Sequence, residues 1–129
     1  MKLYNSLKGL ILEVASISSI TDAIKKRQRV IIYYDGDEPG GRGLREIEPV
    51  CLGYSKAGNP VLRAWDMEGA SHRDYLGVRP LPSWRLFRLD KILSLKPTGE
   101  MFNTPRPNFN PTGDKSMTRV LIVANFNTP

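Results

Sequence analysis

Cysteine and histidine are nearly missing from this 129-residue chain, which contains only Cys51 and His72. An intramolecular disulfide is therefore impossible, and a structural zinc site, which usually takes four thiolate or imidazole ligands, is excluded within one chain. No apolar run approaches the roughly 18 residues that a membrane span needs. Glu13 interrupts the apolar opening segment, which is unlike a secretory signal. We therefore expect a cytoplasmic protein without metal, cofactor or membrane contact.

Blocks of like charge are also absent. The net charge is +6 and the pI about 9.7. Residues 1–65 hold ten Lys/Arg against seven Asp/Glu and residues 66–129 hold nine against six, so each half contributes +3. This diffuse basic balance allows a polyanionic partner without requiring one.

A catalytic constellation is missing too. Ser71 and His72 are adjacent in a loop sequence that has no nucleophile elbow, and Cys51 has no base near it in the sequence. The glycine-rich residues 40–43 lack the lysine-containing ending and the strand-to-helix context of a phosphate-binding loop. We therefore expect a protein that is not an enzyme.

The chain begins with helical patterns and continues with strand patterns. Apolar spacing predicts a helix from Leu3 to Ala15, and an N-cap signature at Ser19 predicts a second one from Ile20 to Arg27. β-branched and aromatic runs then predict short strands separated by Gly and Pro, over residues 29–34, 45–54, 61–66 and 83–92. This order indicates an α+β fold in which N-terminal helices precede a small, strongly bent antiparallel barrel.

Two strand patterns carry unusual residues. Pro49 marks an edge, a bulge or an end of its strand, whereas Glu46 and Glu48 share one face and are expected to be solvated. In the strand that starts at Ser83, alternation places Arg85 and Arg88 on opposite sides, and neither side is purely apolar. We therefore expect a bulge or a bend close to that strand.

The composition changes after the predicted barrel. From Pro97 onward, prolines and glycines form an irregular arm, and a β-branched run over residues 118–126 predicts a final strand. Such a late strand pairs either with its own barrel edge or with a neighbouring copy of the chain. We divide the chain into an N-terminal helix (1–18), a barrel domain (19–102) and a Pro-rich arm with the terminal strand (103–129).

Three stretches in this order resemble the WYL domain family. Residues 45–49 read R-E-I-E-P, residues 62–66 read L-R-A-W-D, and residues 87–92 read F-R-L-D-K-I. The resemblance covers roughly Ser19 to Phe102 and implies an Sm-like or SH3-like barrel. It also implies a ligand-sensing or nucleic-acid-sensing module, which family members usually carry behind a helix-turn-helix DNA reader in bacterial transcription regulators.

The chain departs from the family where the family has its naming tripeptide. Pro60 and Val61 stand in place of Trp and Tyr, and only Leu62 is kept. A role that depends on the missing aromatic pair therefore cannot be transferred. About 28 residues precede the first predicted strand, too few for a full DNA reader, so the resemblance indicates a stand-alone protein of a bacterial or phage-infected cell.

The resemblance implies a binding site rich in arginine. Arg85 and Arg88 match arginines that the family uses for ligand or nucleic acid, and we add four residues of neighbouring strands: Arg63, Tyr34, Arg45 and Lys91. An arginine fork binds phosphate through two hydrogen bonds, and aromatic neighbours offer stacking surfaces for bases. The alternative is structural, with Arg88 paired to Asp90 or Glu48 and Arg85 merely solvated.

We therefore expect a regulatory module that recognises single-stranded nucleic acid or a nucleotide-like anion. The competing hypothesis is a protein-interaction role, in which the arm contacts a polymerase or regulator subunit or joins copies of the chain through the late strand.

Overall fold

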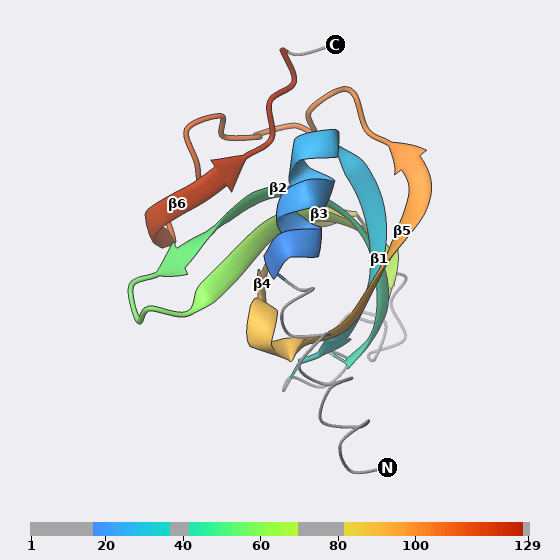
Figure 1. The fold of residues 1–129 in the computed structure, drawn as a ribbon, viewed down its shortest axis with the longest axis horizontal. Coiled ribbons are helices and arrows are strands. Elements are labelled where there is room, and N and C mark those ends of the chain that lie inside the picture. Colours follow the sequence, from blue (N-terminus) through green and yellow to red (C-terminus); the bar gives the residue numbers. More distant parts are fainter. Residues whose placement is uncertain (1–16, 37–41, 70–81, 128–129) are drawn as a thin grey trace.

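The computed structural model describes residues 17–36, 42–69 and 82–127. The predicted helix over residues 3–15, residues 40 and 41 of the glycine-rich segment 40–43, and Ser71 and His72 lie outside this part. One helix occupies residues 17–26 (Figure 1). Its residues Ile20, Ala23 and Ile24 recur at helical spacing and are fully or almost fully buried. No helix in the described part of the chain is long and apolar enough to span a membrane.

The remaining elements are six strands and one short 3-10 helix. They are β1 (Gln28–Asp35), β2 (Arg42–Ser55), β3 (Pro60–Gly69), β4 (Ser83–Arg88), η1 (Leu89–Lys91), β5 (Ile92–Met101) and β6 (Met117–Val123). The strands form one antiparallel sheet in the order β4-β3-β2-β1-β5, and β6 pairs with β2. The predicted strand over residues 83–92 is therefore interrupted by η1, as the mixed polarity of its two sides indicated.

β2 organises the sheet because it is long and bent. Along one edge it pairs with β3, while the opposite edge pairs first with β1 and then with β6. The register with β3 shifts between Pro49 and Cys51, so Pro49 marks a bulge, one of the three predicted outcomes. A bulge at this point lets one strand serve two neighbours in succession.

The sheet curves around the helix, as Figure 1 shows, but the described strands do not form a closed barrel. β4 and β5 are the two ends of the strand order, and among the described pairings no ladder joins them. The expectation of a small barrel is thus met only as a bent antiparallel sheet. The expectation of several N-terminal helices is met by a single short helix in the described chain.

The core lies between the helix and the concave face of the sheet. Its fully buried members include Ile20, Ile32, Ile47, Leu62 and Phe87, which come from the helix and from four strands. Burying a side chain of this size contributes about 1.5–3 kcal/mol to folding. The helix therefore covers the apolar face that the bent sheet would otherwise expose.

The late strand pairs within its own sheet, the first of the two predicted alternatives. β6 lies against the second half of β2, and Gly53 makes this approach possible. A Cβ atom at Gly53 would collide with the Arg119 carbonyl oxygen and come within 2.6 Å of Met117 Sδ. The sequence after β5 is thus packed back onto the sheet.

Candidate ligand-binding site

Two of the predicted arginines meet at one buried carboxylate. Arg45 on β2 donates from Nη1 to Asp66 Oδ2 on β3 at 2.7 Å, and the Nε of Arg85 on β4 lies 3.4 Å from the same oxygen. The side chains of Arg45 and Asp66 are 1% and 6% exposed, whereas that of Arg85 is 33% exposed. One cation of this group is therefore enclosed and the other reaches the surface.

Aromatic rings surround the enclosed arginine. The Arg45 guanidinium carbon lies 5.8 Å from the ring centre of Tyr34 and 5.7 Å from that of Phe87, within the range of a cation–π contact. The two rings pack edge to face at 4.8 Å. Tyr34 therefore helps to hold a buried cation, and its hydroxyl oxygen also accepts a hydrogen bond from the Arg88 backbone N–H at 3.0 Å.

The carboxylate of Asp66 is only partly satisfied. In the described chain Oδ1 is buried and has no hydrogen-bond partner. Burial raises the pKa of Asp66 above its usual range, and the hydrogen bond and charge of Arg45, with the charge of Arg85, offset this only in part. The site therefore combines two guanidinium groups with a carboxylate whose charged form is less favoured than that of a solvated aspartate.

Arg88 and Lys91 lie beside this group at the end of β4. The Arg88 side chain is 46% exposed and binds Asp90 through two hydrogen bonds, of 3.0 Å from Nε and 2.7 Å from Nη2. Lys91 is the last residue of η1 and is half-buried. Of the two partners expected in the structural interpretation, Arg88 therefore has Asp90 and not Glu48.

Arg63 lies on the other face of the sheet. On β3 it is three residues before Asp66, and alternation places the two side chains on opposite sides. Its Nε and Nη2 bind Asp114 of the C-terminal arm, the latter at 3.2 Å from Oδ1. The structure thus gathers Arg45, Arg85, Tyr34 and the Arg88 backbone, and separates Arg63 from them.

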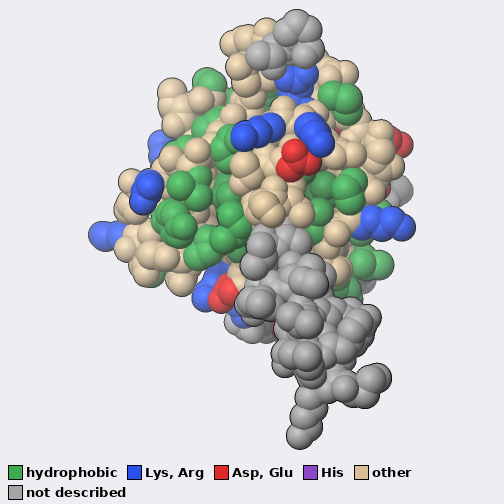
Figure 2. Space-filling model, viewed as in Figure 1, with side chains coloured by type: hydrophobic (Ala, Val, Ile, Leu, Met, Phe, Trp, Pro, Cys, Tyr) green, Lys and Arg blue, Asp and Glu red, His purple; other side chains and the backbone are tan. Residues whose placement is uncertain are grey.

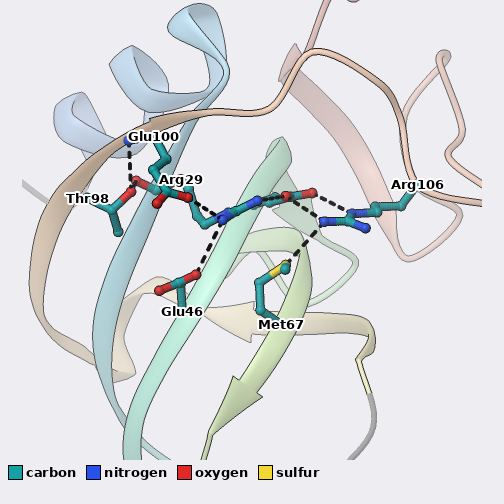
Figure 3. Close-up of polar contacts among 7 residues, drawn as sticks. Arg29, Glu46, Met67, Thr98, Glu100 and Arg106 are labelled. Carbon is teal, nitrogen blue, oxygen red and sulfur yellow. Dashed lines mark hydrogen bonds and ion pairs between the residues drawn. The ribbon is translucent and has the colours of Figure 1, made fainter.

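A second buried carboxylate was expected to be solvated, and this prediction was wrong. Glu46 keeps a 39% exposed side chain, but that of Glu48 is 1% exposed. Arg29 donates to Glu48 Oε2 at 2.9 Å, and Arg106 donates at 2.9 Å to each carboxylate oxygen. Figure 3 shows Arg29 and Arg106 approaching the same carboxylate from opposite sides.

The electrostatics of Glu48 are the reverse of those of Asp66. Burial acts to raise its pKa, but the hydrogen bonds and charges of Arg106 and Arg29 outweigh burial and hold the pKa below its usual range. In turn, the hydrogen bond and the charge of Glu48 raise the pKa of Arg106. Glu48 is thus a fully ionised anchor for two arginines, and one of them comes from the arm.

The arm crosses the outer face of β3 and β4 and is fixed at several points. The Arg106 guanidinium carbon lies 5.7 Å from the ring centre of Trp65, and the indole N–H of Trp84 donates to the Pro107 carbonyl oxygen at 2.7 Å. Further along, Asp114 binds Arg63. Sequence reasoning missed Arg106 and Asp114, because an irregular Pro-rich segment has no periodicity that would show which of its charges turns inward.

Comparison with known proteins identifies the class. The WYL domain model matches residues 15–97, so the chain belongs to the WYL domain family, whose members are regulatory and ligand-binding modules. The arm over residues 103–116 and β6 lie beyond the matched residues. No curated protein matches the chain.

Among solved structures, the chain is similar to proteasome accessory factor B/C (PafBC) of Arthrobacter aurescens, with a TM-score of 0.55 and 20% sequence identity. The similarity covers 75% of this chain and 13% of that one. At this identity the likeness shows the fold. The chain therefore spans a small part of the length of that relative.

The two residues that replace the family Trp and Tyr, Pro60 and Val61, lie on β3 next to β4, the strand that carries Arg85 and Arg88. Val61, which replaces a family aromatic residue, is buried and pairs with Arg88 across β3 and β4. Leu62, which is kept, pairs with Phe87 in the core. The replacement of Trp and Tyr by Pro60 and Val61 thus removes aromatic surface next to β4, and Tyr34 and Phe87 are the rings left near Arg45.

Proposed function

We propose that this protein is a regulatory WYL module that binds an anionic ligand, either single-stranded nucleic acid or a nucleotide, along the β4 edge of the sheet. There Arg85 lies over the Arg45–Asp66 pair on one side of the strand, Arg88 lies on the other side, and Lys91 follows at its end. We call this surface the β4 basic surface. The module acts without catalysis in the cytoplasm of a bacterial or phage-infected cell.

The observation that supports this proposal is an excess of positive charge over one buried carboxylate. Arg45 and Arg85 share Asp66, while Arg88 binds Asp90. Arg85 contributes only its Nε to Asp66, so the two Nη groups of its fork are left for the two-point contact that phosphate accepts.

The test is fluorescence anisotropy of the full chain with labelled single-stranded DNA and RNA across a salt series. We expect binding that weakens steeply with salt, because neutralising phosphates releases counterions. We expect Arg85→Ala to weaken binding about tenfold, the loss of roughly one charge-assisted contact, with less than about 1 kcal/mol lost in the free energy of unfolding.

Arg119→Ala is the matched control. Arg119 is an exposed arginine on β6 whose side chain makes no hydrogen bond or ion pair within the described chain. Arg119→Ala removes the same charge from a different surface, so if the site is local, this variant should bind the oligonucleotides within about twofold of the wild-type affinity. Equal losses in both variants, or binding that does not change with salt, would contradict a binding site on the β4 basic surface.

A second candidate function is self-association through β6. In the described part of the chain this strand pairs with β2 alone, and its Val120 and Leu121 are 38% and 43% exposed. Figure 2 shows hydrophobic side chains gathered on the side of the molecule where β6 lies in Figure 1. An antiparallel strand edge is self-complementary, so the β6 edges of two copies can pair around a twofold axis.

Native mass spectrometry and light scattering test this candidate. We expect a dimer at micromolar concentration, and Leu121→Lys should return it to a monomer because a charge on an edge strand opposes strand addition. Lys115→Leu, which removes a charge outside β6, is the comparison variant. A wild-type protein that stays monomeric at high concentration would rule out this role.

A further inference from the structure

A cavity of about 190 Å³ lies between the sheet and the arm, away from the β4 basic surface. Its sheet wall includes Val50 and Cys51 of β2, Arg63 of β3 and Trp84 of β4, and its arm wall includes Phe109. The arm wall comes from a segment beyond residues 15–97, the part matched by the family model. The cavity is therefore built by a feature that this chain adds to its WYL domain.

The arm is shaped and anchored on both sides of this cavity. Before it, Arg106 binds Glu48, and after it, Asp114 binds Arg63. Between these anchors Asn108 and Gly113 adopt left-handed backbone conformations, with φ of 67° and 123°. Both residues line the cavity and lie at turns, in which the Phe109 N–H donates to the Arg106 carbonyl oxygen at 3.1 Å and the Gly113 N–H to that of Asn110 at 3.2 Å.

The walls are mainly apolar and aromatic. Val50, Cys51, Trp84 and Phe109 present carbon, sulfur and ring surfaces, and Phe109 is held edge to face against Phe126 at 5.1 Å. Burial raises the pKa of the Cys51 thiol to about 11, so the thiol is a neutral wall group at physiological pH. An apolar cavity of about 150 Å³ is large enough to hold benzene. This cavity therefore accommodates a single substituted aromatic ring.

The polar groups at the cavity leave donors available. Asp114 and the Trp84 indole N–H are already engaged, by Arg63 and by the Pro107 carbonyl oxygen. In the described chain, Arg63 binds Asp114 through Nε and Nη2, so its Nη1 makes no hydrogen bond. Asn110 accepts two hydrogen bonds from Thr112 at Oδ1, and within the same part of the chain its side-chain NH₂ makes none. A ligand that carries acceptors would satisfy these donors, whereas the Arg63–Asp114 pair has no net charge to attract an ion.

We propose that the cavity between β2, β3, β4 and the arm binds a neutral heteroaromatic ring that carries carbonyl or ring-nitrogen acceptors, of the size of a pyrimidine base. The ring would pack against Trp84 and Phe109 and accept hydrogen bonds from Arg63. A free base or nucleoside and a base within a strand share this chemistry. The cavity is distinct from the β4 basic surface, so the inference does not depend on strand binding there.

The two tryptophans of the chain make the site directly observable. In a ¹H–¹⁵N spectrum of the full protein only Trp65 and Trp84 give indole N–H signals. We expect cytosine or uracil to shift the Trp84 signal with an affinity on the order of millimolar, as suits a ligand of about eight heavy atoms. Toluene, which has no acceptors, should bind more weakly.

Two variants test the contacts. Arg63→Lys keeps the charge opposite Asp114 but loses the fork, so base binding should weaken about tenfold. Arg42→Lys is the matched control, since Arg42 also pairs through Nε with an aspartate, Asp35, but does not line the cavity. If Arg63→Lys fails to fold, Val50→Ile fills part of the cavity with one methyl group and should weaken binding while the unfolding temperature holds or rises.

The outcomes separate the sources and the two proposals. A shift with the free base alone indicates a small-molecule ligand, and a shift with a single-stranded oligopyrimidine alone indicates a base supplied by a strand. Arg85→Ala should leave free-base binding unchanged even though it weakens strand binding. The proposal is overturned if neither probe shifts Trp84 at about 10 mM, a concentration well above the affinity expected for so small a ligand. It is also overturned if toluene binds as tightly as the bases.

Discussion

Glu48 and Asp66 are two buried carboxylates on neighbouring strands, and each lies between two arginines. Glu48 accepts one hydrogen bond from Arg29 and two from Arg106, and its pKa is lowered. Asp66 accepts one hydrogen bond from Arg45, with Arg85 at a longer distance, and its pKa is raised because burial outweighs these contacts. Similar residues in similar burial therefore have opposite electrostatic character.

Glu48 is therefore a structural anchor, whereas the group around Asp66 keeps hydrogen-bonding atoms that a ligand could use. At Glu48 both carboxylate oxygens are bound by arginine, and the result is a fixed connection between the sheet and the arm. Arg29 also pairs with Glu46 and Glu100. At Asp66 one oxygen has no partner within the described chain, and one of the two arginines extends to the surface. An anionic ligand is better received where guanidinium groups are in excess of their hydrogen-bond acceptors.

The largest expected effect is the removal of the anchor charge. Glu48→Gln should lower the free energy of unfolding by about 3 kcal/mol, because Arg106 loses its ion pair with a buried carboxylate. Arg29 keeps its ion pairs with Glu46 and Glu100, which limits the loss. Urea unfolding followed by circular dichroism measures it. Glu46→Gln is the control on the same strand, and it should cost less than about 1 kcal/mol because Glu46 is partly solvated. A loss at position 48 no larger than that of the control would show that Glu48 is not an anchor.

An intermediate effect is expected at Asp66, and its pH dependence should have the opposite sign. Asp66→Asn should cost about 2 kcal/mol, less than a fully satisfied pair, because the variant also removes the burial cost of the carboxylate. A carboxyl with a raised folded pKa holds its proton more tightly when folded, so its contribution to stability decreases as pH rises above its ordinary value of 3.8. For Glu48 the contribution is lost as pH falls below 4.5.

Urea midpoints between pH 3 and pH 7 measure both pH dependences. The difference in free energy between the wild type and Asp66→Asn should shrink as pH rises, whereas the difference between the wild type and Glu48→Gln should grow. If the two differences change in the same direction, the contrast between the two carboxylates fails.

The smallest expected effect is at the second arm contact. Hydrogen bonds from Arg63 and Ser116 outweigh burial and lower the pKa of Asp114 from 3.8 to about 2. Asp114→Asn should therefore cost about 1–2 kcal/mol at neutral pH. A lowered folded pKa means that this stability is present above pH 4 and disappears as pH falls towards 2, so wild type and variant should converge there. A constant difference across this range would assign the loss to packing rather than charge.

The regular elements could largely be predicted from local patterns. The strand of residues 29–34 and the strand ending near Tyr54 were predicted from side-chain type and alternation, and both are present. A bulge or a bend was predicted close to the strand that starts at Ser83, and η1 interrupts that strand after Arg88. Burial of Glu48 could not be predicted in the same way. A period-two pattern places Glu46 and Glu48 on one face, but it does not show that Arg106, 58 residues later, covers only one of them.

Only some of the predicted site residues lie together in the structure, because local patterns do not show which distant residues meet. Strand alternation correctly indicated that Arg85 and Arg88 lie on opposite sides of β4, but it did not show which acidic residue each would meet. Arg45 proved to be enclosed, and Arg63 proved to bind the arm. Pairing across strands that are distant in sequence depends on register, and single-residue shifts such as that at Pro49 change which side chains meet.

By itself, the sequence determined the class of the molecule: a basic chain with one cysteine, a series of short β-branched strands and the motifs of a WYL domain. Those features depend on composition and on neighbours within a few residues, which local physics constrains. The tertiary structure alone decided which carboxylate becomes an anchor, and that the arm folds back to form a cavity over the sheet. Those outcomes depend on contacts between residues distant in the sequence, such as Arg106 with Glu48, 58 positions apart, and Asp114 with Arg63, 51 positions apart. The energies of these contacts exist only after the sheet has formed.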